Sequence, residues 1–258
     1  MEAAELINLS FYRFFELGDP LAQRALLKSA ISDLKLRGTI LLAHEGVNAA
    51  VSGTASSITR FKTIATELFG VQNSDYKESK VLEHSFNRLL IKIKKEIITV
   101  GDPDVRPDRL TANYIQPAEF KKWLDEKRPL LLLDARNQYE VELGTFHGAQ
   151  HLKLDSSREF SNRAAHLVEK GLRQPVVTFC TGGIRCEKAS AVLLKLGLKE
   201  VYQLEGGILR YLEEQGSEHF QGNCFVFDWR MAVDANLRPV ARSKDDRDRF
   251  GRHRKPIL

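Results

Sequence analysis

Along the first hundred positions, apolar residues recur at strand and helix spacings that predict one small domain. The aromatic-rich run over residues 7–17 predicts a strand. Pro20 then opens a helix with apolar residues such as Leu27 and Ile31 on one face, and we expect Gly38 to end it. The domain therefore begins as a strand followed by a helix.

The rest of this domain is predicted to hold a second helix and three further strands. The helix is capped by Thr54 or Ser56 and ends at Gly70. His44-Glu45-Gly46 forms the turn of a hairpin between the first two of these strands. The order βαββαβ predicts a ferredoxin-like domain over residues 1–100. The three strands cover residues 39–43, 47–52 and 88–98.

From Thr111 onward, short buried strands alternate with helices, which predicts a parallel sheet covered on both faces. A charged, proline-containing linker over residues 101–110 separates this second domain, residues 111–216, from the first. Residues 217–258 form a C-terminal segment with a basic tail. The predicted strands are 130–133, 176–179 and 201–204, and the predicted helices begin at Pro117 and span 161–171 and 187–196.

Ligands bind sheets of this kind at the carboxyl ends of the strands. Three segments with chemically active or flexible residues follow three predicted strands directly, so we expect them to share one edge of the sheet. They are Asp134-Ala135-Arg136, Cys180-Thr181-Gly182-Gly183-Ile184-Arg185-Cys186 and Glu205-Gly206-Gly207.

The second of these segments, here named the Cys180 loop (residues 180–186), carries the strongest chemical signal. Gly182 and Gly183 let the loop curl so that backbone N–H groups point inward. The following helix N-terminus and Arg185 add positive charge. A cysteine after a strand is commonly a small core residue, but these neighbours favour a nucleophilic thiolate, and the same groups would surround an anion bound to Cys180.

The length of the loop separates two chemistries. Protein tyrosine phosphatases place a longer loop between cysteine and arginine, which makes room for a phosphate group. Here only Thr181 to Ile184 intervene, which resembles the C-x-x-G-x-R loop of rhodanese domains, whose cysteine carries a persulfide sulfur. The loop therefore disfavours a phosphatase.

Composition narrows the class of protein further. A chain of 258 residues with 43% hydrophobic residues can bury two cores. The sequence contains no run of about 18 apolar residues, so no membrane span is expected. The acidic start Met1-Glu2-Ala3-Ala4-Glu5 lacks the pattern of a secretion signal. Three cysteines do not form a disulfide framework, so we expect a cytoplasmic protein that contacts no membrane.

The net charge of +5 is concentrated near the C-terminus, where residues 231–258 hold eight Lys/Arg against four Asp/Glu. A basic tail suits a polyanionic partner such as RNA, and a solvated charged end explains it equally well. The side chains that could contact RNA phosphates or bases are Trp229, Arg230, Arg238, Arg242, Arg247, Arg249, Arg252 and Arg254.

Four segments of the second domain resemble the signatures of rhodanese domains, which implies that fold for residues 115–215. A closer resemblance, to the bacterial tRNA uridine hydroxylases, covers nearly the whole chain. It rests on the runs DARNQYE, CTGGIRCEK, VYQLEGGIL and CFVFD, and on HEGVN, after which Ala49 replaces the family's usual glycine. The four rhodanese-like segments are Asp134-Ala135-Arg136 with Glu140, residues 144–149, Cys180 to Arg185 and residues 204–207.

The resemblance implies an N-terminal acylphosphatase-like domain and an enzyme that makes 5-hydroxyuridine at the wobble position of certain tRNAs with molecular oxygen. Cys180 would be the nucleophile, and the anticodon loop of tRNA would be the partner. A single-stranded loop presents its bases at less cost than a duplex does. The sequence shows no paired metal ligands and no dinucleotide-type glycine motif, so no cofactor is expected beyond oxygen.

Other side chains near the loop have both a structural and a functional interpretation. Arg185 is expected to face the loop's anion, with pairing to Asp134 or Glu187 as the alternative. Asp134 and Arg136 are expected to brace the loop by a salt bridge, and Glu140 to brace the edge of the sheet. Two histidines, His147 and His151, have a metal-like spacing but lie in a turn and a strand, which disfavours zinc.

The remaining two cysteines are assigned differently. Cys186 could resolve an oxidised Cys180 by forming a disulfide, or it could pack as a small residue. Cys224 is predicted to be buried in a strand.

Two mechanisms fit the predicted hydroxylase: attack of the thiolate at C6 of uracil, or delivery of oxygen to C5 by an oxidised sulfur on Cys180. Three other functions stay open. They are a sulfurtransferase that carries a persulfide on Cys180, a binding module with an unreactive thiol, and the disfavoured phosphatase.

Overall fold

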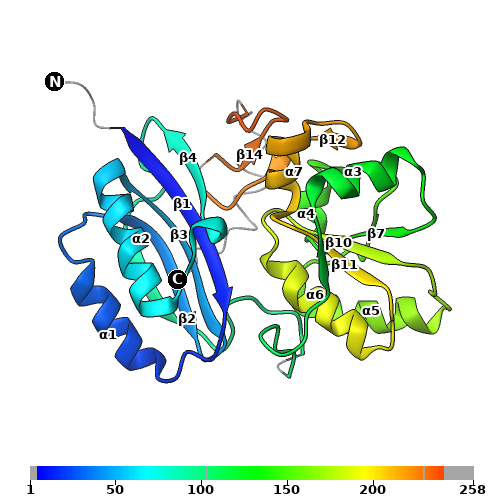
Figure 1. Ribbon diagram of the computed structural model, residues 1–258, viewed down its shortest axis with the longest axis horizontal. Helices are drawn as coiled ribbons and strands as arrows, with labels where there is room; N and C mark the ends of the chain where they lie inside the picture. Colours follow the sequence, from blue (N-terminus) through cyan, green and yellow to red (C-terminus); the bar gives the residue numbers. More distant parts are fainter. Residues whose placement is uncertain (1–4, 103, 229, 241–258) are drawn as a thin grey trace. The chain divides into compact units, whose positions relative to one another are not determined.

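The computed structural model describes residues 5–102, 104–228 and 230–240 (Figure 1). They form two compact units. One runs to Thr99 and includes residues 104–110, and the other comprises Val100–Asp102 and the residues from Thr111 onward. The predicted linker residues are thus divided between the two units.

The N-terminal unit is a five-stranded sheet with two helices on one face (Figure 1). Its strand order is β4-β1-β3-β2-β5, and all neighbouring strands are antiparallel except β2 and β5. The strands are β1 (Leu6–Phe14), β2 (Arg37–Ala43), β3 (Gly46–Thr54), β4 (Lys77–Val81) and β5 (Leu89–Ile93); the helices are α1 (Pro20–Ala30), α2 (Ala55–Phe69) and the short 3-10 helix η1 (Asn73–Asp75).

The ferredoxin-like prediction is confirmed, but the assignment of its last strand is wrong. The split βαββαβ unit is completed by β4, which pairs with β1. The strand predicted at 88–98 is shorter and forms β5, an additional strand parallel to β2. Polar residues such as Lys77 and Glu78 are depleted in strands, so the pattern of β4 was missed, although an edge strand with one neighbour tolerates them.

The end of α1 also differs from the prediction. The helix ends at Ala30, with Ile31 as its C-terminal cap. Gly38 lies instead in β2 at φ +150°, where a Cβ atom would lie 2.2 Å from the carbonyl oxygen of Ala50. A glycine is therefore needed for the close approach of β2 to β3, and not for ending the helix.

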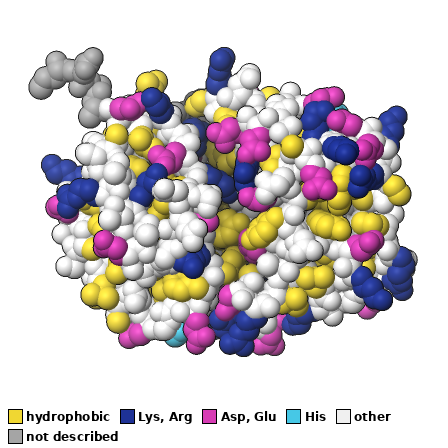
Figure 2. Space-filling model, in the orientation of Figure 1, with side chains coloured by type: hydrophobic (Ala, Val, Ile, Leu, Met, Phe, Trp, Pro, Cys, Tyr) yellow, Lys and Arg dark blue, Asp and Glu magenta, His cyan; other side chains and the backbone are white. Residues whose placement is uncertain are grey.

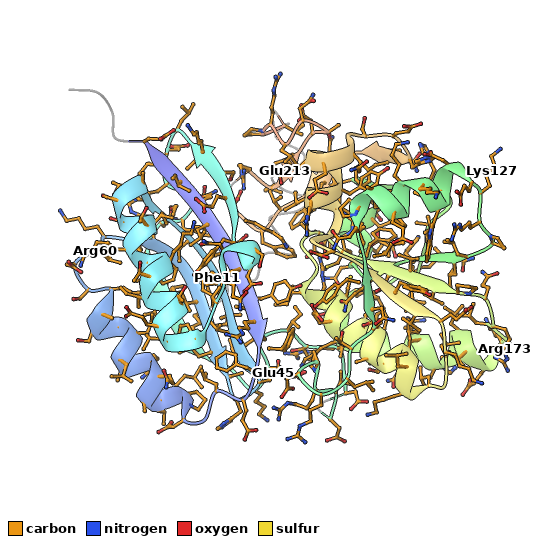
Figure 3. All side chains as sticks on the ribbon, in the orientation of Figure 1. Phe11, Glu45, Arg60, Lys127, Arg173 and Glu213 are labelled. Carbon is orange, nitrogen blue, oxygen red and sulfur yellow. The ribbon has the colours of Figure 1, made fainter. Side chains whose placement is uncertain are left out.

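Apolar side chains fill the space between this sheet and its helices. Phe11 of β1 points toward α2, where its ring lies 6.0 Å from that of Phe61, whereas Arg60 projects outward (Figure 3). The predicted ends of α2 are confirmed, because the Thr54 side chain accepts a hydrogen bond from the Ser57 N–H and Gly70 caps the helix in the left-handed conformation.

The second unit contains five parallel strands in the order β6-β11-β10-β7-β9. Helices α3 and α7 cover one face of this sheet, and α5 and α6 cover the other (Figure 1). The predicted parallel sheet is thus confirmed. Its strands are β6 (Asn113–Ile115), β7 (Leu131–Asp134), β9 (Gln150–His151), β10 (Val176–Phe179) and β11 (Val201–Leu204); its helices are α3 (Pro117–Asp125), α4 (Gln138–Val141), η2 (Ser157–Glu159), α5 (Phe160–Glu169), α6 (Ile184–Lys195) and α7 (Gly207–Gln215).

The described residues between 217 and 240 belong to this second unit and contribute three short strands to two antiparallel pairs. Strand β12 (Phe220–Gly222) pairs with β8 (Gly144–Phe146), and β13 (Cys224–Phe225) pairs with β14 (Ala232–Val233). Cys224 is therefore buried in a strand, as predicted. The basic tail from residue 241 and Trp229 lie outside the described residues. Within the part of the chain that the structure describes, no helix has both the length and the hydropathy needed to cross a bilayer.

Candidate active site

The Cys180 loop joins β10 to α6. Cys180 follows the last residue of the strand, and the helix begins at Ile184. Gly183 has φ +99°, a conformation that favours glycine, and its N–H donates a hydrogen bond of 3.1 Å to Cys180 Sγ. The fully buried sulfur therefore lies at a helix N-terminus, where the partial positive charge favours an anion.

The surroundings of Cys180 favour the thiolate. Burial by itself raises the pKa of a thiol. Against this, the Cys186 side chain donates a hydrogen bond to Cys180, Arg185 places a positive charge nearby, and the N–H groups of Arg185 and Gly183 point at the sulfur. Together these groups hold the pKa of Cys180 well below its usual value, which favours the nucleophilic form.

Cys186 is the protonated partner of this pair. Burial and the hydrogen bond to Cys180 hold the pKa of Cys186 well above its usual value, so its thiol remains a donor. The structure thus brings the two sulfurs within hydrogen-bonding distance, as a resolving role for Cys186 would require. That role stays a prediction.

Arg185 pairs with Glu140, and not with Asp134 or Glu187. Its Nη1 and Nη2 donate hydrogen bonds to the two Glu140 carboxylate oxygens at 2.5 and 2.8 Å, and both side chains are buried. Such a bidentate pair fixes the plane of the guanidinium group beside Cys180. Glu187 instead accepts hydrogen bonds from the hydroxyl groups of Thr111 and Tyr114.

Asp134 and Arg136 form a second buried pair at the end of β7. Arg136 Nη2 donates to Asp134 at 2.6 Å and to the carbonyl oxygen of Gly144 at 2.6 Å, and the Thr145 hydroxyl donates to Asp134. The predicted salt bridge therefore joins β7 to β8 and does not touch the Cys180 loop directly. Its role is to position the strand on which the C-terminal segment pairs.

The Gly-Gly pair after β11 meets the Cys180 loop, as the sheet-edge prediction requires. The N–H groups of Ile208 and Leu209 donate to the carbonyl oxygens of Cys180 and Thr181. A Cβ atom on Gly207 would lie 2.4 Å from the Cys180 carbonyl oxygen, and its φ of +67° also favours glycine. Gly207 thus allows the first turn of α7 to approach the Cys180 loop closely enough for these two hydrogen bonds to form.

Residues 225–227 lie on the other side of the loop. The Thr181 hydroxyl donates to the carbonyl oxygen of Phe225 at 3.2 Å. The Phe225 ring makes edge contacts with Tyr139 and with Phe227, at centroid distances of 5.3 and 5.1 Å. The Arg185 guanidinium lies over the Phe227 ring, 5.5 Å from its centroid. Neither the Phe227 contact nor the Glu140 partner was predicted from the sequence.

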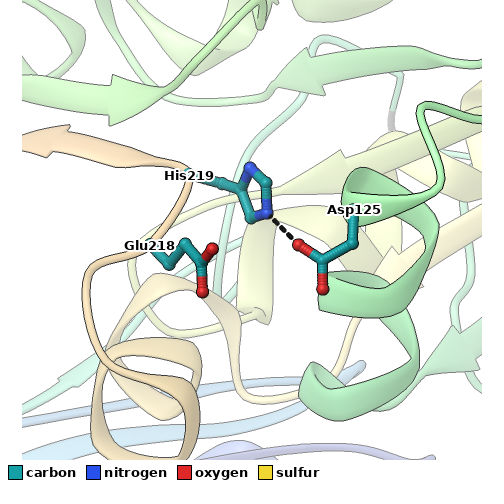
Figure 4. A group of neighbouring side chains, drawn as sticks. All are labelled: Asp125, Glu218 and His219. Atoms are coloured by element: carbon teal, nitrogen blue, oxygen red, sulfur yellow. Dashed lines mark hydrogen bonds and ion pairs between the residues drawn. The ribbon is translucent and has the colours of Figure 1, made fainter.

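A separate cluster contains Asp125, Glu218 and His219, whose potential ligand atoms all lie within 4.8 Å of one another (Figure 4). The Lys121 ammonium group contacts both carboxylates at 2.8 Å, and His219 Nε2 lies 2.6 Å from Asp125 Oδ1. These contacts make an ion-pair cluster that ties α3 to the segment before β12. Among the described residues, His147 and His151 belong to no comparable group.

Comparison with known proteins identifies the family. Residues 6–97 match the UPF0176 acylphosphatase-like domain, and residues 116–214 match the rhodanese-like domain. The chain is 41% identical over 251 residues to the tRNA uridine(34) hydroxylase of Cupriavidus pinatubonensis, covering 92% of this chain and 86% of the relative. The chain belongs to the tRNA uridine(34) hydroxylase family.

Two further members of the tRNA uridine(34) hydroxylase family match this chain with similar sequence identity and coverage. The protein of Thiobacillus denitrificans is 42% identical, with 91% of this chain and 97% of the relative covered. The protein of Synechococcus elongatus is 43% identical, with 90% and 87% covered. The family and the two-domain fold predicted from the sequence are therefore confirmed.

The HEGVN segment that contributed to this family assignment has a structural function in the N-terminal unit. Glu45 is buried, and its carboxylate accepts a hydrogen bond of 2.6 Å from the Ile97 N–H. Asn48 Nδ2 donates to the carbonyl oxygen of the same residue at 3.3 Å. Both side chains thus hold the chain that follows β5, and Ala49 is accommodated as a buried residue of β3.

Charged side chains provide no single dominant patch on the face shown in Figure 2, where acidic and basic groups alternate over each unit. Of the arginines considered for RNA contact, Arg230 forms an ion pair with Asp228 in the hairpin after β13. Arg238 lies just after β14, where its backbone N–H is bonded to Asp234.

Proposed function

We propose that this tRNA uridine(34) hydroxylase family member hydroxylates the wobble uridine in the anticodon loop of tRNA to 5-hydroxyuridine, with molecular oxygen as co-substrate. The observation that carries the proposal is 41–43% identity, over nine-tenths of the chain, to proteins named tRNA uridine(34) hydroxylase. The Cys180 loop supplies the nucleophile that the chemistry needs.

The uracil ring is electron-poor at C6, so it can accept a thiolate there. In the proposed step, Cys180 Sγ forms a bond to C6 and the electron pair of the C5–C6 double bond moves toward C5. The electron-rich C5 then adds molecular oxygen as a hydroperoxide, and loss of the C5 proton and of the thiolate restores the ring. The released Cys180 thiolate attacks the terminal oxygen of the hydroperoxide, which breaks the O–O bond and leaves 5-hydroxyuridine and a sulfenic acid on Cys180. In the alternative, the Cys180 thiolate adds molecular oxygen first, and this oxidised sulfur transfers its terminal oxygen to C5 as the O–O bond breaks and the C5 proton is lost, which leaves the same sulfenic acid on Cys180. Both routes need Cys180 as a thiolate at the start.

The electron balance suggests a function for Cys186. Hydroxylation takes two electrons from the base, whereas molecular oxygen accepts four when one atom enters the product and the other becomes water. The remaining two electrons and two protons would come from Cys180 and Cys186 as they pass to a disulfide. A small thiol reductant would then restore both cysteines, which suits a reducing cytoplasm.

We propose no resident metal or flavin, because the sequence offers no motif for either. The substrate base comes from a single-stranded loop, so it can be turned toward the protein without opening a duplex. A persulfide on Cys180, as in a sulfurtransferase, would use the same loop. The names of the relatives favour hydroxylation over sulfur transfer.

The decisive experiment is mass analysis of nucleosides from tRNA that lacks its wobble modification. The tRNA is incubated with the purified protein and a thiol reductant, in air and under nitrogen. We expect uridine to gain one oxygen atom in air only, and Cys180→Ser to abolish the product while tRNA binding survives. Cys224→Ala, which removes another buried thiol, is the matched control and should retain the activity.

Two results would contradict the proposal. Normal hydroxylation by Cys180→Ser would remove the nucleophile from the mechanism. Unchanged tRNA together with sulfur transfer from thiosulfate by the wild type would instead assign a sulfurtransferase.

A further inference from the structure

Phe227 presents an aromatic ring to solvent beside the Cys180 loop. The side chain is 57% exposed, although it is large and apolar. An exposed ring does not contribute the favourable free energy that burial of its apolar surface would give, so that free energy is available when a ligand covers the ring. Its guanidinium neighbour, Arg185, is the same group that stabilises the negative charge of Cys180. The exposed ring is therefore only one side chain away from the proposed nucleophile.

The backbone around this ring is held in place. The Val226 N–H donates to the carbonyl oxygen of Met231 at 2.9 Å, which closes the hairpin between β13 and β14. On the other side, Phe225 is buried and its carbonyl oxygen accepts a hydrogen bond from Thr181 of the Cys180 loop. Phe227 is thus fixed relative to the loop before any ligand arrives, which lowers the entropic cost of binding to it.

The surface has the chemistry of a site for a nucleobase. Bases of single-stranded RNA are commonly recognised by stacking on aromatic side chains, and this stacking accepts any base because every base has a π-face. A protein partner could also cover an exposed ring, but the family's named substrate is a tRNA.

We propose that Phe227 is a stacking platform for a base that flanks the target uridine in the single-stranded loop of the tRNA. This inference rests on the proposed function and adds a substrate-positioning residue to it. The target base itself has to approach the Cys180 sulfur to within roughly 3–3.5 Å. Arg185 occupies the side of the Phe227 ring that is turned toward the loop, so the stacked base is a neighbour of the target.

The test uses three substitutions of Phe227 and one control, with an RNA hairpin of the anticodon stem and loop as the probe. Phe227→Ala and Phe227→Leu remove the aromatic face, whereas Phe227→Trp keeps one. We expect the first two to weaken binding and raise KM by roughly 5- to 100-fold, with a smaller change in kcat. Phe227→Trp should bind like the wild type. Leu21→Ala removes another exposed apolar side chain, 63% exposed on α1, and should change nothing.

A further measurement separates stacking from mere support of Arg185. The ultraviolet titration of the Cys180 thiolate should be the same in Phe227→Leu as in the wild type. Fluorescence of the indole introduced by Phe227→Trp should be quenched when the RNA hairpin is added. A wild-type KM and affinity in Phe227→Ala would overturn the platform, as would losses that track a shifted Cys180 titration. If the wild type binds the hairpin but makes no 5-hydroxyuridine, the proposed function fails while the binding comparison still tests Phe227.

Discussion

Cys180 and Cys224 are both fully buried in the second unit, yet the structure gives their thiols opposite character. Burial raises the pKa of Cys224 to about 12, with only a partial offset from Arg136. The same burial acts on Cys180, but Cys186, Arg185 and two backbone N–H groups reverse its effect. Depth therefore does not make a thiol reactive or inert in this protein; the donors around the sulfur do.

The two thiols should also give opposite pH dependences of stability. Cys180 has a folded-state pKa below the unfolded value of about 8.5, so its contribution is complete above that value and is lost as the pH falls through the folded pKa. Cys224 has a raised pKa, so its contribution is complete below about 8.5 and is lost as the pH rises toward 12.

Removing the charge beside Cys180 should produce the largest effect. Arg185→Met leaves the Glu140 carboxylate buried without its partner and takes a cation from the thiolate. We expect the pKa of Cys180 to rise, hydroxylation to fall by roughly 100-fold or more, and the free energy of unfolding to fall by about 3–5 kcal/mol. Ultraviolet titration, nucleoside analysis and urea denaturation measure the three quantities.

Arg136→Met is the matched control, because it breaks the other buried arginine–carboxylate pair, with Asp134. It should cost a similar amount of stability but leave the Cys180 titration unchanged. An equal shift of the Cys180 pKa in both variants would mean that general loosening of the unit, and not the Arg185 charge, sets the thiolate.

A smaller effect is expected from crowding the loop. Gly207→Ala would place a Cβ atom 2.4 Å from the Cys180 carbonyl oxygen and 2.8 Å from that of Thr181, at a positive φ. We expect a loss of roughly 1–3 kcal/mol in the free energy of unfolding and a displaced loop with reduced activity. Gly148→Ala is the control for the positive φ, since Gly148 has φ +74° and its Cβ atom would meet nothing within 4 Å. Equal losses in the two variants would show that α7 does not constrain the loop.

The residues changed in these variants differ in how far their environment could be predicted from the sequence. The strand, glycine loop and helix around Cys180 are contiguous, so local periodicity and glycine positions were enough to predict them. Glu140, the partner of Arg185, lies 45 residues away in the sequence. The position of a carboxylate shortly after a strand does not indicate which cation it binds. Glu140 was therefore expected to brace the sheet edge, and its contact with Arg185 became visible only in the fold.

The same reasoning explains the missed strand. β4 is polar because it lies at the edge of its sheet beside β1 alone, so hydrophobic alternation gives little signal there. The apolar residues of β5 gave the stronger pattern and were placed in the wrong position of the βαββαβ order. Hydrophobic periodicity thus predicted which apolar segments form strands better than it predicted which strands pair with each other.

Removing the second thiol tests the proposed electron source. Cys186→Ala takes away the hydrogen bond that is the largest of the contributions lowering the pKa of Cys180, so that pKa should rise. Repeated turnover should slow because the disulfide cannot form. In the wild type, peptide mapping after reaction in air without reductant should find Cys180 linked to Cys186. Full turnover by Cys186→Ala, with no such link in the wild type, would place the reductant elsewhere.

The smallest expected effect concerns the inert thiol. Cys224→Ala removes a sulfur from a packed site, so we expect about 1 kcal/mol less stability at neutral pH and no change in the Cys180 titration. The wild type should lose more stability than the variant between about pH 8.5 and 10, because only its unfolded chain ionises at this position. Urea denaturation at both pH values measures the loss of unfolding free energy in each protein. The contributions of the other titrating groups are the same in the two proteins and cancel when the two losses are subtracted. Identical losses in both proteins would mean that the Cys224 thiol ionises as readily folded as unfolded, and the contrast with Cys180 would then lie in nucleophile placement alone.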